Sequence, residues 1–172
     1  MALSVLELND IALLLGDGTG TPSRSPGFAT LPRDAVVTGA AALAQARLNP
    51  RQTISQFWLR LGTEPLHNAR SHARHHADLA WAQLQQLAAA AGNPDELILA
   101  VPGSFTREQL AVLLGIAQRA SFRAIGLVDC PHERLGFAGG RAVCLVVGLG
   151  RHRVRHLHLV EAIGYLAAAR DE

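Results

Sequence analysis

Short apolar segments separated by turn-forming residues run along most of the chain. Residues 4–8 and 11–15 are two such segments, and Asn9 and Asp10 between them predict a tight two-residue β-hairpin. The segment 97–101 is continuously apolar, which is typical of a strand covered on both faces. The same pattern predicts further strands at 35–38, 124–128, 142–147 and 152–160.

Apolar residues at helical spacing predict helices between these strands. The predicted helices lie at 39–48, 54–61, 73–91, after Thr106 and, as a short helix, after Pro131. In the second of them, Ile54, Phe57, Trp58 and Leu61 form an i, i+3, i+4, i+7 stripe. Thr106 followed by Gln109 predicts a capping box at a helix start. The segments 16–26 and 62–71 are expected to be loops or connectors.

The order of these elements predicts the fold class. A hairpin and a strand come first, helices follow, and a β-α-β-α unit leads to a final hairpin, which predicts an α/β sandwich. Antiparallel strands followed by parallel ones are typical of a ribonuclease-H-like, mixed five-stranded sheet with flanking helices. We expect one domain over residues 1–172, with a small helical excursion at 39–92.

Composition narrows the class of protein. The 172 residues are 49% apolar and 17% charged, which supports a packed core rather than a disordered tail. A net charge of +2 gives no reason to expect binding to nucleic acid or an acidic membrane surface. Two cysteines are too few for a disulfide scaffold, and neither a secretory signal nor a run of about 20 apolar residues is visible. We therefore expect a cytoplasmic protein without a membrane segment.

Three stretches resemble the nucleotide-binding domain of DnaK-type (70 kDa heat-shock) chaperones, members of the actin-like ATPase superfamily. Residues 39–62 are similar to that family's Gly-x-Ala-Ala…Asn-Pro-x-x-Thr…Arg-Leu-x-Gly segment, and residues 97–110 resemble its Val-Pro-Ala-x-Phe corner. Residues 142–154 lie where the family has its second phosphate loop. The resemblance covers the first of the family's two lobes; the second lobe and the substrate-binding domain have no counterpart.

The resemblance implies ATP bound between two lobes, with Mg²⁺ held by carboxylates and the phosphates held by two glycine hairpins. The first hairpin in the family carries Asp-x-Gly-Thr-Thr. Here Glu7, Asn9 and Asp10 occupy that place without glycine or threonine. Glu7 could take the place of the family's Asp, but a plain hairpin is the favoured interpretation, because a short turn has few amides to offer a triphosphate.

The second phosphate loop keeps only its glycines. Gly148 and Gly150 match the family's glycines, whereas Val146 and Arg153 replace its two carboxylates and Arg151 replaces its threonine. Valine is no metal ligand and arginine repels a divalent cation. The resemblance therefore implies a degenerate phosphate site at Glu7, Asn9, Asp10, Gly148, Gly150 and Arg151, with no metal site.

The remaining catalytic positions of the family are also replaced. Its Asn-Glu-Pro appears here as Asp129, Cys130 and Pro131, although Asp129 could in principle reach across. All sixteen basic residues are arginine, so the family's catalytic lysine has no counterpart, and arginine does not replace a compact ammonium freely. We expect no catalytic residues, no ATP hydrolysis and no resident cofactor, with Mg-ATP as the alternative.

Other clusters carry alternative chemistry. His72 and His76 are spaced to chelate a transition metal, with His75 between them, but a solvated helix face is favoured. On the last predicted strand, Arg151, Arg153 and Arg155 share one face and could bind an anion or an acidic partner, although a charged edge strand is favoured. The glycine-rich segment 16–21 is expected to be a loop, and Cys130 beside His132 is not expected to be a nucleophile.

Three functional hypotheses remain. The first is a non-hydrolysing DnaK-like lobe that acts as a protein-binding or scaffold module, chaperone-related, with a protein partner or a separate second lobe. The second is the N-terminal half of a genuine ATP-binding chaperone domain. The third is an anion- or metal-responsive module. Apolar surface that a second lobe would otherwise cover makes self-association into a homo-oligomer plausible.

Overall fold

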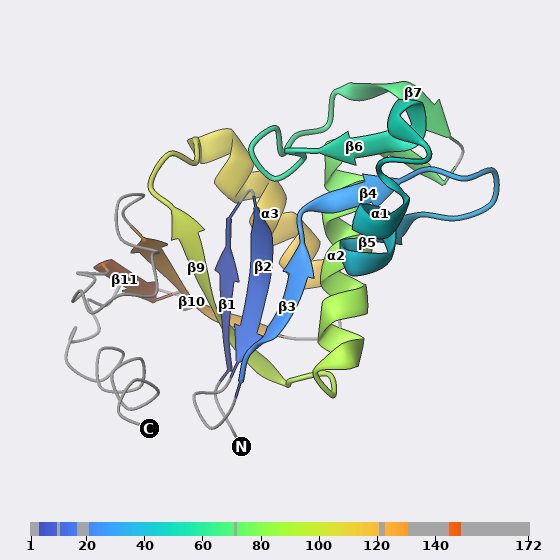
Figure 1. Ribbon diagram of the computed structural model, residues 1–172. Coiled ribbons are helices and arrows are strands. Elements are labelled where there is room, and N and C mark those ends of the chain that lie inside the picture. The colour runs from blue at the N-terminus through green and yellow to red at the C-terminus, as the bar shows by residue number, and fades with distance from the viewer. Residues whose placement is uncertain are drawn as a thin grey trace.

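The computed structural model describes residues 4–9, 11–16, 21–70, 72–120, 123–130 and 145–148. Strands and helices are combined in these residues, so the predicted α/β class is confirmed. Figure 1 shows a large twisted sheet at the centre of the molecule, with a smaller group of strands beside its far end.

The main sheet has six strands in the order β11-β10-β9-β1-β2-β3. Their bounds are β1 (Ser4–Leu8), β2 (Ala12–Gly16), β3 (Ser23–Pro26), β9 (Glu96–Pro102), β10 (Arg123–Cys130) and β11 (Leu145–Gly148). Strands β1, β9 and β10 are mutually parallel, and the other neighbours are antiparallel. The sheet is mixed, as predicted, but it has six strands rather than five. The predicted strand at 35–38 does not join it, because β5 (Val37–Thr38) pairs in a smaller sheet and β3 pairs with β2 instead.

Two helices, α2 (His76–Ala90) and α3 (Arg107–Arg119), pack against one face of this sheet. Figure 1 shows both on the same side of the main sheet. Alternate residues of the strands are completely buried against them, as the two-residue period of a strand requires. The shared core contains Leu6, Leu8, Leu13, Leu15, Leu97, Leu99, Leu79, Leu84, Leu87, Leu113 and Ile116.

The smaller part of the molecule lies between β3 and α2. It consists of β4 (Phe28–Thr30), β5 (Val37–Thr38), α1 (Gly39–Gln45), the 3-10 turn η1 (Pro50–Gln52), β6 (Thr53–Ser55), β7 (Pro65–Arg70) and β8 (Ala73–His75). Strands β5-β4-β6 form one small sheet, and β7 and β8 form a hairpin. The segment 39–92, expected to be helical, therefore contains strands as well as α1 and α2.

The predicted helix at 54–61 is wrong. Thr53 and Ile54 belong to β6, which pairs with β4, and Gln56 has a positive φ of 59° that no α-helix accommodates. Phe57 and Trp58 are buried as the apolar stripe suggested, but from a turn. The pairing of β6 with β4 determines the conformation of this segment, although its apolar residues have helical spacing over a short stretch.

Three further boundaries differ from the sequence-based expectation. Part of the predicted loop 16–26 is strand β3, and the predicted connector 62–71 contains β7, because each pairs with a neighbouring strand. The long helix begins at His76 rather than near Ala73, since 73–75 pairs with β7 as β8. The hairpin between β1 and β2 is confirmed, with three residues rather than two between the strands.

The capping box at the start of α3 is confirmed. The Thr106 hydroxyl accepts from the Gln109 backbone N–H at 3.2 Å, and the Gln109 side chain accepts from the Thr106 N–H at 2.9 Å.

No helix within the described ranges is long and apolar enough to cross a membrane.

Candidate functional site

The carboxyl ends of the parallel strands β1, β9 and β10 lie at one edge of the main sheet, which we call the carboxyl edge. The last strand residues there are Leu8, Pro102 and Cys130. In open α/β sheets this edge is where ligands commonly bind. It is also where the resemblance places the first phosphate loop, so the turn after β1 and the start of α3 after β9 are the two backbone features to inspect.

The turn after β1 is closed by its own asparagine. Asn9 Oδ1 accepts hydrogen bonds from the backbone N–H groups of Ile11, at 3.0 Å, and Ala12, at 2.8 Å. This is a side-chain-to-backbone turn of the kind that asparagine favours. Two of the amides that a phosphate would need are therefore already occupied by the protein itself.

The start of α3 is closed in a similar way. The N–H of Gln109 donates to Thr106 Oγ1, and the Gln109 side chain also donates from Nε2 to the carbonyl of Leu59 at 2.7 Å. A helix N-terminus attracts anions through unsatisfied N–H groups. Capping by Thr106 satisfies one of these groups internally, so this helix start is less suited to a phosphate than an uncapped one.

Glu7 is the only acidic side chain described at the turn after β1. Leu6 and Leu8 face the core, so strand alternation places Glu7 on the opposite face of the sheet, between Leu14 of β2 and Ala100 of β9. Burial raises the pKa of the Glu7 carboxyl, while the hydrogen bond from Asn9 Nδ2 to Oε1, at 3.2 Å, opposes that rise. Among the described residues, Asn9 is the side-chain partner of the Glu7 carboxylate.

The other predicted phosphate-loop residues are placed apart or not described. Gly148 pairs with Gly126 of β10, which pairs with Ile98 of β9, which in turn pairs with Val5 of β1. Gly148 therefore lies three strand spacings from Val5, a distance of roughly 14 Å. The register therefore does not bring Gly148 beside the turn at Asn9. Asp10, Gly150, Arg151 and Arg153 lie outside the described residues, as do Cys144, the segments 17–20 and 152–160, and the helix predicted after Pro131.

Asp129 and Val146 are placed by their backbone alone. Asp129 pairs with Val101 of β9 at the carboxyl edge, and Val146 pairs with Val128 of β10. Glu7 pairs with Ala100 of β9, the residue before Val101, so Asp129 and Glu7 are one residue out of register on the two strands that flank β9.

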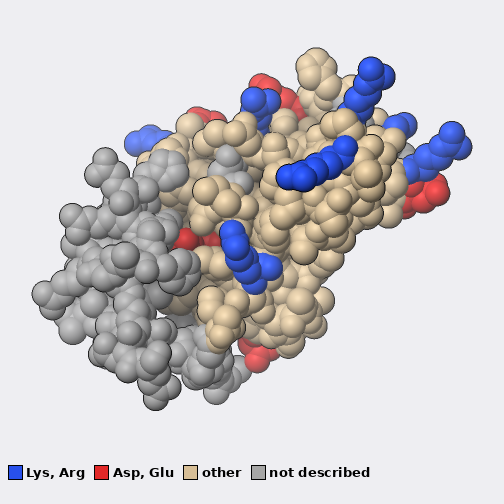
Figure 2. All heavy atoms as spheres, viewed as in Figure 1, with Lys and Arg blue, Asp and Glu red and all other residues tan. Residues whose placement is uncertain are grey.

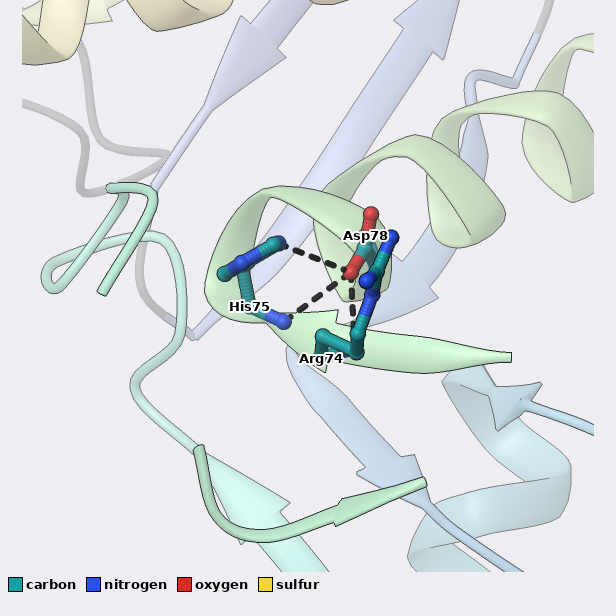
Figure 3. Close-up of polar contacts among 3 residues, drawn as sticks. All are labelled: Arg74, His75 and Asp78. Atoms are coloured by element: carbon teal, nitrogen blue, oxygen red, sulfur yellow. Dashed lines mark hydrogen bonds and ion pairs between the residues drawn. The ribbon is translucent and has the colours of Figure 1, made fainter. Parts of the chain in front are cut away.

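Of the three histidines, His75 takes part in closing the start of α2. Asp78 Oδ2 accepts from the backbone N–H groups of Arg74, at 2.7 Å, and His75, at 2.9 Å, and lies 3.2 Å from His75 Nδ1 (Figure 3). His75 and Asp78 together form a capping box. Nowhere in the described part of the chain do three or more histidine, cysteine or acidic residues gather as a metal site. His75 therefore serves the helix start, whereas His72 precedes β8, so His72 and His76 do not form the predicted pair on one helix.

The neighbouring His76 is partly buried. Burial lowers the pKa of its imidazole, Arg60 lowers it further, and Glu64 opposes both effects. His76 therefore tends to stay neutral, and its protonation disfavours the folded state.

The closing role of Asn9 was not expected from the sequence pattern. The signal was present, because asparagine is among the residues whose short side chain caps turns. What the pattern could not show is that the carboxamide would take two amides of that turn at once.

Comparison with known proteins adds no family. A scan against protein-family models finds no match to this chain, and a search of curated proteins finds no match either.

Proposed function

We propose that this chain is a non-hydrolysing lobe of the actin-like ATPase type, similar to the first lobe of DnaK-type chaperones, and that it acts as a protein-binding module. The strand order supports this proposal. Three antiparallel strands, β3-β2-β1, are continued by two strands parallel to β1, which is the arrangement expected of a ribonuclease-H-like sheet.

The observation that carries the non-hydrolysing part is the closed turn at Asn9. A phosphate loop presents free backbone N–H groups, and glycines let the backbone approach the phosphate. Here Asn9 Oδ1 holds the N–H groups of Ile11 and Ala12. Binding a triphosphate would first require breaking both hydrogen bonds, and the chain offers no lysine to offset that cost.

The proposed protein-binding role is based on the structural features that the chain retains. The core-forming leucines and the capping boxes of α2 and α3 are present, while the residues that would hold Mg²⁺ and phosphate in the family are replaced. A stable scaffold without the chemistry of its fold type is suited to holding another polypeptide, which includes a separate second lobe or a second copy of the chain.

Titration calorimetry with Mg-ATP and a phosphate-release assay test the proposal. We expect no binding heat at micromolar nucleotide and no release above the buffer rate. Micromolar binding would instead support the genuine ATP-binding alternative, and turnover would refute the proposal outright. The variant Asn9→Gly frees the two amides and adds glycine, so a gain of nucleotide binding in this variant would show that Asn9 is the element that closes the site.

A further inference from the structure

The hairpin of β7 and β8 forms a two-stranded sheet that joins neither of the other sheets. A hairpin of two strands is only marginally stable in water by itself, so this one depends on packing against the rest of the protein. Leu66 of β7 and Ala73 of β8 provide that packing, since both are buried in the core cluster. Loosening the hairpin would therefore expose apolar side chains without breaking any strand pair of the main sheet.

One carboxylate ties this hairpin to α2. Asp78 Oδ2, in the first turn of the helix, accepts from the backbone N–H groups of Arg74 and His75 in β8 (Figure 3). The chain passes from β8 directly into α2, with His75 as the N-cap and His76 as the first helical residue. Two adjacent imidazoles therefore occupy the junction between the hairpin and the helix.

Protonation would leave N–H groups unpaired at two histidines of this region. In the capping box the His75 side chain accepts from the Asp78 backbone N–H, and an imidazolium, with a proton on both ring nitrogens, accepts nothing. The ion pair of His75 Nδ1 with Asp78 Oδ2, at 3.2 Å, opposes this loss. His72 Nε2 is buried with no hydrogen-bond partner in the described part of the chain, so a proton there would have no acceptor.

His76 is the imidazole that the folded state keeps neutral. Burial has the largest effect on its pKa, which it lowers; Arg60 lowers it further and Glu64 opposes both. The Ala77 N–H donates to the Gly62 carbonyl at 3.2 Å, which holds the segment of these two charges beside the helix start. The N-terminal end of a helix is also the positive end of its dipole, so a positive charge on His76 is unfavourable there.

Histidine is concentrated in this part of the chain. Residues 60–78 contain four of the eight histidines, three arginines and two acidic residues, so their net charge is +1 with neutral histidines and +5 with all four protonated. On β7 the titratable and charged side chains are His67 and Arg70. Figure 2 shows basic side chains projecting from the part of the molecule that carries β6 and β7 in Figure 1. Accumulated charge of one sign opposes compact packing.

We propose that residues 65–79, which are the β7–β8 hairpin and the first turn of α2, form an acid-sensitive unit that opens locally when its histidines are protonated. The main sheet stays folded, because its strand pairs do not involve this unit. Opening breaks the contacts of Asp78 and uncovers Leu66 and Ala73, so the chain presents new apolar surface in acid. This unit needs neither nucleotide nor a protein partner, so it goes beyond the proposed function.

Hydrogen exchange followed by mass spectrometry tests this unit in the full chain. Exchange is measured at pH 7.5 and pH 5.5, with rates corrected for the intrinsic effect of pH, and peptides covering 65–79 are compared with peptides covering 96–102 of β9. We expect the protection of 65–79 to fall at least about threefold at the lower pH, while that of 96–102 stays the same.

Substitutions identify the groups that respond. The double variant His75→Ser/His76→Gln keeps a side-chain acceptor at the N-cap but removes both titrating rings, so 65–79 should stay protected at both pH values. His67→Gln is the matched control, because His67 lies in the same hairpin but is exposed, and it should respond like the wild type. Urea unfolding at pH 7.5 checks that each variant is folded.

Three outcomes would overturn the inference. Equal loss of protection in 65–79 and 96–102 would indicate that acid unfolds the whole protein rather than this unit. Protection of 65–79 that does not change with pH would show that the histidines do not control it. A wild-type response in the double variant would assign the effect to other groups.

Discussion

The indole N–H of Trp58 donates to the Oε1 atom of Gln83 at 2.8 Å inside the core. Gln83 is completely buried and donates from Nε2 to the Ser25 hydroxyl at 2.8 Å and to the Pro26 carbonyl at 2.7 Å. One carboxamide of α2 therefore joins the turn that carries Trp58 to the end of β3. This polar link fixes how the smaller group of strands sits on the main sheet.

Replacing Gln83 should destabilise the protein strongly. Gln83→Leu leaves the Trp58 N–H buried without a partner, which costs about 1–3 kcal/mol, and removes the donor to the part-buried Pro26 carbonyl. We expect a loss of about 2–4 kcal/mol in the free energy of unfolding, measured by urea titration. Gln85→Leu, two residues along the same helix but only partly buried, is the matched control and should change stability by less than about 0.5 kcal/mol. Equal effects of the two substitutions would contradict this account.

Removing the Asn9 side chain should loosen the turn after β1. Asn9→Ala deletes the acceptor for two backbone N–H groups, which should lower the free energy of unfolding by about 1–2 kcal/mol. Asn9→Asp keeps an acceptor for both amides but replaces the donor to Glu7 with a second carboxylate. It should therefore be less damaging than alanine at pH 5 and lose that advantage at pH 8. A chemical-denaturation series at both pH values checks the order of the variants, and identical pH responses would argue against the contact with Glu7.

Glu7 should make the protein less stable as the pH rises. Its folded-state pKa is raised, so the folded state binds the proton more tightly than the unfolded state. The stability contributed by this group is then lost as the pH increases through the range above the ordinary value of 4.5. Glu7→Gln keeps an acceptor for Asn9 without the charge, so its melting temperature should exceed the wild-type value at pH 7.5 and approach it near pH 4.5. Glu108→Gln is an informative contrast, because the pKa of Glu108 is lowered and its substitution should act in the opposite direction.

His76 should have the opposite pH dependence in a different range. Because its folded-state pKa is lowered, the unfolded state binds the proton more tightly below the ordinary value of 6.5, and stability should fall as the pH drops through that value. Titration of the imidazole followed by NMR gives a direct test. Arg60→Gln should raise the pKa of His76 and Glu64→Gln should lower it, since these charges act with opposite sign. If neither substitution changed the pKa of His76, burial would be the sole cause of its lowered value.

Several elements were predictable because their signals are local. The capping box of Thr106 and Gln109 needs only a spacing of three residues, and the continuous apolar run at 97–101 is enough to indicate a covered strand. The hairpin of 4–8 with 12–16 follows from two apolar runs around Asn9. Each of these features depends on neighbours in sequence.

The misjudged elements depend on partners far along the chain. Residues 53–55 pair with β4, more than twenty residues earlier, and this pairing replaced the helix that Ile54 and Trp58 suggested. Likewise β3 was hidden in a segment rich in glycine, serine and proline, because its strand conformation comes from pairing with β2.

The sequence by itself determines the α/β class, the apolar core positions and the absence of lysine, because composition and apolar periodicity do not depend on contacts between distant residues. Tertiary structure alone decides that Gln83 reaches Trp58 and β3, that Asn9 occupies two amides of its turn, and that Leu66 of β7 is buried in the core. Hydrogen-bond partners and exposure depend on which distant segments lie next to each other, and this is decided only when the helices pack on the sheet.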